Sequence, residues 1–94
     1  MERALLGNWF GTVGGESVRL EFTGDGHLNY EISSGGRRQI MLLTYRVDGG
    51  AIVTDQPSHP REERTAFRFG ARGTLVLAFG GIESLFRRGH PSAN

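Results

Sequence analysis

The sequence predicts an all-β fold, a small eight-stranded up-and-down antiparallel barrel. Three observations lead to this prediction: helical periodicity is nearly absent, apolar and polar residues alternate in eight short runs, and glycine or Asp-Gly separates the runs. The 94 residues can bury one hydrophobic core. We therefore expect a single domain over residues 1–94, with 1–6 as an N-terminal cover and 89–94 as a flexible tail.

The first four runs span 7–13, 17–23, 27–33 and 37–47. The first contains Trp9. The second and third carry an apolar residue at every other position: Val18, Leu20, Phe22, Leu28, Tyr30 and Ile32. Such alternation is typical of a strand with one buried face. The fourth run is the longest, and its centre is apolar on both faces, from Ile40 to Leu43.

The last four runs are shorter and span 51–55, 64–70, 74–79 and 82–87. In 64–70, Phe67 and Phe69 face one way and Arg68 faces the other. The seventh and eighth runs supply further inward positions, which are Leu75, Leu77, Phe79, Ile82 and Phe86. All eight runs together therefore provide one continuous apolar interior.

The connections predict one tight end and one looser end. Those after the second, fourth and sixth runs are short, at 24–26, 48–50 and 71–73, and Asp-Gly is favoured where a turn needs positive φ. The connections at the other end are 14–16, 34–36, 56–63 and 80–81, which include the one long loop. Eight strands joined in this way can close and so remove both sheet edges.

Three short segments carry a family resemblance: Leu6-Gly7-Asn8-Trp9, Phe22 with Asp25-Gly26, and Phe86-Arg87-Arg88. With them the chain resembles the lipocalin/calycin superfamily, and it is most similar to the short bacterial lipocalin-like domains. The resemblance implies that Trp9 lies at the closed floor of the barrel, with an arginine of the last strand across its indole ring. Arg88 is the better candidate for this arginine, and Arg87 is the alternative.

The barrel interior is the first candidate site. The resemblance implies non-enzymatic binding of a small hydrophobic or amphipathic ligand, which would enter from the looser end. The residues expected to bind it are Tyr30, Ile32, Gln39, Met41, Thr65, Phe67 and Phe79. The alternative is a filled core, because four inward phenylalanines and two tyrosines occupy much of the space inside short strands.

The long loop is the second candidate. Its two prolines stiffen it, and Pro57, His59 and Arg61 are predicted to gate the barrel or to contact a polar group of the ligand. The alternative is a solvated connection whose charges pair among themselves.

A surface for self-association is the third candidate. A strand with one wet face should alternate, but Ile40 and Leu42 add apolar side chains on the outer face of the fourth run. Exposed apolar patches often mark an interface, so we predict a homodimer. A packed barrel that acts only as a protein-interaction or assembly module is the alternative to ligand binding. Scattered exposed residues are also common.

Other classes of function receive little support. The net charge of +1 gives no reason to expect nucleic acid as a partner. The chain has no cysteine and no pair of histidines at metal-binding spacing, so we expect no metal and no cofactor. No membrane span or signal peptide is visible, and we expect a cytoplasmic protein without a membrane partner. No catalytic residue is predicted; a calycin-type cyclase or isomerase, with Asp55, Glu62 or Glu63 acting with Tyr45, is a weaker alternative.

Overall fold

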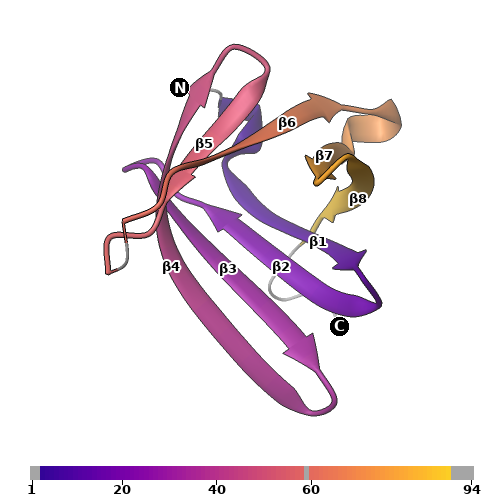
Figure 1. The fold of residues 1–94 in the computed structure, drawn as a ribbon. Coiled ribbons are helices and arrows are strands. Elements are labelled where there is room, and N and C mark those ends of the chain that lie inside the picture. The colour runs from indigo at the N-terminus through magenta and orange to yellow at the C-terminus, as the bar shows by residue number, and fades with distance from the viewer. Residues whose placement is uncertain (1–2, 59, 90–94) are drawn as a thin grey trace.

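Eight antiparallel strands form a closed barrel in the computed structural model, which describes residues 3–58 and 60–89 (Figure 1). Each strand pairs with the next along the chain, and β1 pairs with β8 to close the barrel. The strands are β1 (Gly7–Val13), β2 (Glu16–Phe22), β3 (His27–Ser34), β4 (Arg37–Asp48), β5 (Ala51–Asp55), β6 (Glu63–Phe69), β7 (Leu75–Phe79) and β8 (Ile82–Arg88). The predicted fold is confirmed, and no strand end differs from its predicted position by more than one residue.

Two short 3-10 helices lie at the tight end of the barrel. The first, η1 (Arg3–Leu5), precedes β1, and its Leu5 side chain is fully buried. The second, η2 (Ala71–Gly73), replaces the simple turn expected between β6 and β7. Arg72 in η2 has a φ of 59°, a left-handed conformation, so this connection includes a mild local strain.

The core follows directly from the alternation of the strands. Trp9 on β1 lies opposite Leu20 on β2, which in turn lies opposite Tyr30 on β3, and all three point inward. The buried cluster contains Leu5, Trp9, Val18, Leu20, Phe22, Leu28, Tyr45, Ile52, Leu75, Leu77 and Phe86. Because side chains alternate between the two faces of a strand, this one register fixes which residues can reach the interior.

Trp9 and Arg88 close the floor of the barrel. The Arg88 guanidinium carbon lies 4.1 Å from the centre of the Trp9 ring, so of the two arginines that the resemblance offers, Arg88 is the one over the indole. The Trp9 indole N–H donates to the Leu5 carbonyl at 2.8 Å, and Arg88 donates to the carbonyls of Leu6 and Ala4. The N-terminal segment is therefore fastened across the floor by both side chains.

Gly7 leaves room for this arginine. Its φ is +110°, which L side chains rarely adopt, and a Cβ at this position would lie 2.9 Å from an Arg88 guanidinium nitrogen. A larger residue would thus strain the backbone and displace the arginine.

The open end is uneven because the strands differ in length. β4 has twelve residues and β5 has five, and the two pair only from Thr44–Asp55 to Asp48–Ala51. The first seven residues of β4, Arg37–Leu43, pair with β3 alone. The β3–β4 hairpin therefore projects beyond the shorter strands on the other side of the mouth (Figure 1).

An ion-pair network holds the outer face of this hairpin. The Glu31 carboxylate accepts from Arg19 at 2.8 Å and lies 3.2 Å from the Arg38 guanidinium. Only 12% of the Glu31 side chain is exposed, so these contacts are better shielded from water than an ordinary surface ion pair. The network ties β2, β3 and β4 together.

We expect Trp9→Ala to lower the free energy of unfolding by about 3–5 kcal/mol, because it removes a fully buried aromatic side chain and both of its floor contacts. Urea denaturation followed by circular dichroism measures this loss. Phe10→Ala is the matched control, since Phe10 is the next residue on β1 but lies outward and is 40% exposed. Equal losses for the two variants would contradict the role of Trp9 in closing the floor.

Candidate functional site

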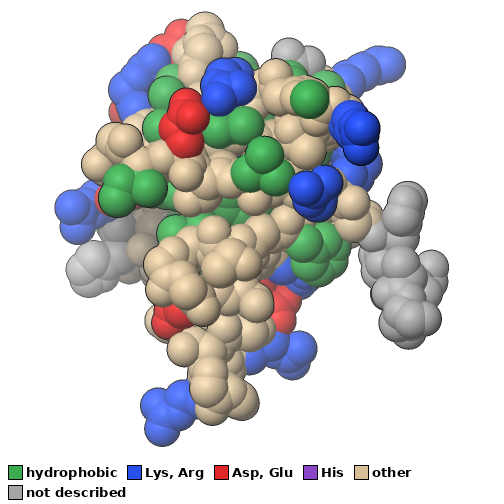
Figure 2. Space-filling model, turned by 90° about the vertical axis from the view of Figure 1, so that its right-hand side faces the viewer, with side chains coloured by type: hydrophobic (Ala, Val, Ile, Leu, Met, Phe, Trp, Pro, Cys, Tyr) green, Lys and Arg blue, Asp and Glu red, His purple; other side chains and the backbone are tan. Residues whose placement is uncertain are grey.

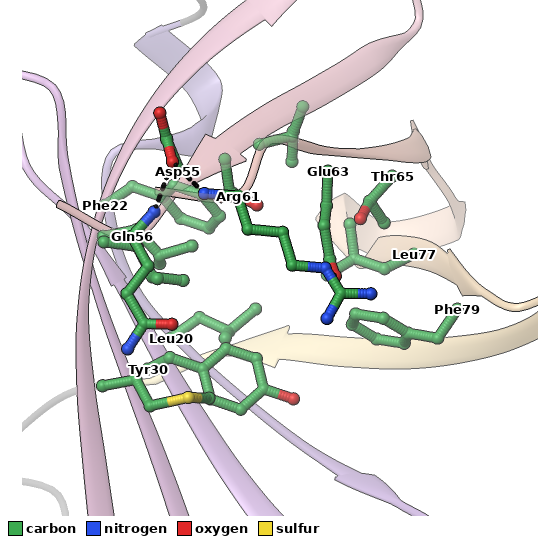
Figure 3. Close-up of a pocket in the computed structure, with 15 residues that line it drawn as sticks. Leu20, Phe22, Tyr30, Asp55, Gln56, Arg61, Glu63, Thr65, Leu77 and Phe79 are labelled. Atoms are coloured by element: carbon green, nitrogen blue, oxygen red, sulfur yellow. Dashed lines mark hydrogen bonds and ion pairs between the residues drawn. The ribbon is translucent and has the colours of Figure 1, made fainter. Parts of the chain in front are cut away.

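The barrel contains an apolar cavity of about 340 Å³ that opens toward the long loop (Figure 3). Fifteen residues line it: Leu20, Phe22, Leu28, Tyr30, Met41, Leu43, Ile52, Thr54, Asp55, Gln56, Arg61, Glu63, Thr65, Leu77 and Phe79. Space therefore remains inside the barrel even though its lower half is packed.

The lower wall of the cavity is apolar and fixed. Phe22 meets Tyr45 edge to face, with ring centres 5.0 Å apart, and this pair lies between the cavity and the floor. The Tyr45 hydroxyl donates to the Thr23 carbonyl at 3.0 Å, which holds the ring toward the tight end. Phe79 forms the opposite wall and packs against Phe86 at 6.4 Å. These ring contacts limit how deeply a ligand can enter.

The rim carries the polar groups of the cavity. One oxygen of Asp55 accepts the backbone N–H of Gln56 and that of Arg61, each at 2.8 Å. This carboxylate thus fastens both ends of the loop between β5 and β6. Figure 3 shows the Gln56 and Arg61 side chains extending from these two points over the cavity.

Charges of both signs face the mouth. The Arg61 guanidinium lies 3.5 Å from Glu63, and both side chains are largely exposed. Solvent-exposed pairs of this kind are weak, so Arg61 can exchange Glu63 for a ligand group at little cost. Thr65, on the same strand as Glu63, adds a hydroxyl below the pair.

Tyr30 is partly buried and contributes a phenol group to the cavity wall. Burial raises the pKa of this phenol above its ordinary value of 10.0, and the nearby charge of Glu16 adds to the shift. Tyr30 therefore stays protonated at neutral pH and can act as a hydrogen-bond donor or acceptor.

Four of the seven predicted ligand-binding residues line this cavity: Tyr30, Met41, Thr65 and Phe79. The structure places Ile32 and Gln39 outside it, in a shallow depression on the projecting β3–β4 hairpin, because that hairpin rises above the opposite wall. Phe67 packs against the core and against Phe69, with ring centres 5.9 Å apart.

The predicted gating residues have different positions. Arg61 lines the cavity, Pro57 is exposed and outside it, and His59 lies outside the described residues, as does His90 with most of the predicted tail. Sequence reasoning did not single out Gln56, Thr54 or Glu63 as ligand-binding residues. Their position at the strand ends that flank the proline-containing loop was the available signal.

Ile40 and Leu42, the predicted interface residues, are 52% and 65% exposed on the outer face of β4. This exposure leaves both β4 side chains accessible to a partner. On another face of the barrel, which carries β7 and β8, hydrophobic side chains are interspersed with charged ones (Figure 2).

Among the described residues, no three His, Asp or Glu side chains form a group that could hold a metal ion. The Tyr45 hydroxyl is bound to Thr23 near the tight end, whereas Asp55 and Glu63 line the mouth. Within the same residues, no helix is long and apolar enough to cross a membrane.

Comparison with protein-family models, with curated proteins and with solved structures found no match to this chain.

The two tyrosines allow a direct test of the cavity wall, because the chain has no others. The folded protein holds the Tyr30 proton more tightly than the unfolded chain does, so this contribution to stability is present below pH 10 and is lost as the pH rises through the folded pKa. Subtracting the phenolate absorbance of Tyr30→Phe from that of the wild type leaves the absorbance of Tyr30. We expect this difference to appear above pH 10. The same difference in concentrated urea serves as the control, and identical curves would contradict the burial of Tyr30.

Proposed function

We propose that this barrel binds a small amphipathic molecule, with its apolar part in the cavity and its polar end at the rim. The observation that carries the proposal is the cavity of about 340 Å³, apolar below and polar at its mouth. This combination of apolar walls and a few oriented polar groups is typical of small-molecule sites. The closed eight-stranded barrel with the Trp9–Arg88 floor also supports the proposal that the chain is a lipocalin-like, non-enzymatic binding protein.

The volume limits the ligand to a small one. Ligand pockets usually span about 300–1,000 Å³, and a cavity of about 150 Å³ accepts benzene. A cavity about twice that size fits a bicyclic aromatic ring system or a chain of medium length. Burying about 200 Å² of such a ligand would contribute roughly 5 kcal/mol before the cost of association, so apolar burial alone supports binding no tighter than about 0.2 mM.

The rim favours a ligand with a single anionic or hydrogen-bonding group. Arg61 and Gln56 can both donate toward the mouth, and Thr65 can donate from below. Asp55 and Glu63 on the same rim disfavour a ligand with several negative charges. A carboxylate or sulfonate at one end of an aromatic molecule fits this distribution of charge.

We expect Thr65→Trp to weaken binding of anilinonaphthalene sulfonate, an amphipathic fluorescent probe, at least about tenfold, because the larger side chain fills the cavity below the rim. Fluorescence titration measures this. Ala66→Trp is the matched control, since Ala66 is the next residue on β6 and faces outward. No binding by the wild type, or equal binding by both variants, would refute the cavity as the site.

Arg61→Ala tests the orientation of the ligand. We expect it to weaken binding of naphthoate about five- to tenfold and to leave binding of uncharged naphthol nearly unchanged, because one charge-assisted hydrogen bond is lost. Arg64→Ala is the control, because Arg64 pairs with Asp48 at 3.0 Å, away from the cavity. Equal effects of Arg61→Ala on the two ligands would show that Arg61 does not bind the polar end.

A further inference from the structure

β4 presents an unpaired edge along more than half its length. Its pairing with β5 begins at Thr44, so in the described part of the chain no strand lies beside Arg37–Leu43 on the side away from β3. The point where β4 loses its pairing with β5 lies next to the cavity, because Met41 and Leu43, just beyond this point, line the cavity. The wall of the barrel is thus lower on the β5 side at this point.

The backbone of this segment is oriented for pairing. The Tyr45 N–H donates to the Gly26 carbonyl at 2.9 Å, on the β3 side. Because amide directions alternate along an antiparallel strand, the N–H and C=O groups of Arg38, Ile40 and Leu42 point to the open side. The edge therefore offers three donors and three acceptors in a row.

Two common protections of an exposed edge, a proline and a β-bulge, are absent from Arg37–Leu43. The segment contains no proline, and its pairing with β3 runs without a bulge. Its outward side chains Ile40 and Leu42 are 52% and 65% exposed. The Arg19–Glu31–Arg38 network holds the hairpin in place, so pairing would require little further ordering.

We propose that a second copy of this chain pairs with the edge, antiparallel, about a two-fold axis at Ile40. This register matches the seven free residues of each copy with one another. It joins Ile40 to the partner's Ile40 and Leu42 to the partner's Arg38, and it permits six backbone hydrogen bonds. The apolar side chains of both copies then form one outer cluster.

Charge supports this direction and register. The free segment begins with Arg37 and Arg38, and beyond its other end Asp55 lies opposite Thr44. Antiparallel pairing brings Arg37 of each copy toward Asp55 of the other. A shift of the axis to Leu42 would place Arg38 opposite Arg46 and would run into β5.

The pairing would also complete the cavity wall, an inference that rests on the proposed function. Met41 and Leu43 face the cavity, and the proposed register sets the partner's Gln39 opposite Met41 and the partner's Arg37 opposite Leu43. Opposite residues share a face of the sheet, so both partner side chains would extend the wall at its low point. The two cavities of the dimer would thus lie on either side of the shared edge.

A cysteine cross-link tests the register, because the chain has no cysteine. In a hydrogen-bonded antiparallel pair the Cα atoms are about 5.5 Å apart, within the range that a disulfide spans. Under an added mild oxidant such as oxidised glutathione, we expect Ile40→Cys to form a disulfide-linked dimer roughly tenfold faster than Ile82→Cys, because only position 40 would lie next to its own copy. Ile82 is a fair control, since it is 72% exposed and lies on β8. Equal rates would overturn the proposed register.

Sedimentation of uncross-linked protein tests the dimer itself. We expect the wild type and Ile82→Lys to sediment as two chains of 10.3 kDa each, and Leu42→Lys to sediment as one, because an exposed lysine disfavours edge pairing. A monomeric wild type, or a Leu42→Lys dimer, would overturn the inference. A monomer that binds anilinonaphthalene sulfonate would leave the proposed function intact, whereas a dimer that binds no probe would refute the function alone.

Discussion

Closure of the barrel depends on the contact between Trp9 and Arg88. β1 and β8 share three register pairs, whereas β1 and β2 share seven. The seam between β1 and β8 is therefore the shorter of the two ladders that β1 forms. Trp9 and Arg88 lie directly opposite each other in this seam, and both also bind the N-terminal segment. The first and last strands of the barrel and the N-terminal segment are therefore joined by these two side chains. Without this seam, β1 and β8 would be two edge strands.

Unequal strand lengths account for both the cavity mouth and the free edge at the open end. A barrel of equal strands would have a level mouth and no free edge. Here β5 stops after five residues while β4 continues for twelve. The same difference lets the β5–β6 loop reach over the cavity and leaves Arg37–Leu43 unpaired on one side. The cavity mouth and the β4 edge are thus two results of one local feature.

The sequence was sufficient for the strands, their order and the tight end, because alternation and Asp-Gly turns are local signals. The resemblance gave the positions of Trp9 and Arg88. The extent of the cavity could not be predicted from local signals, because it depends on how far each strand reaches at the open end. Ile32 and Gln39 therefore lie above the cavity. The role of Asp55 was also hidden, because its bonds to Gln56 and Arg61 form only when the loop folds back.

The attachment of the β5–β6 loop to Asp55 has a consequence for how this protein can diversify. Both loop ends are bonded to one carboxylate at the end of a strand, so the barrel fixes where the loop begins and returns. The described residues in between, Pro57, Ser58 and Pro60, are exposed and lie outside the buried core. Loop sequences of different length or charge could be exchanged there on an unchanged scaffold. For the proposed binding function, selectivity can thus evolve, or be engineered, separately from stability.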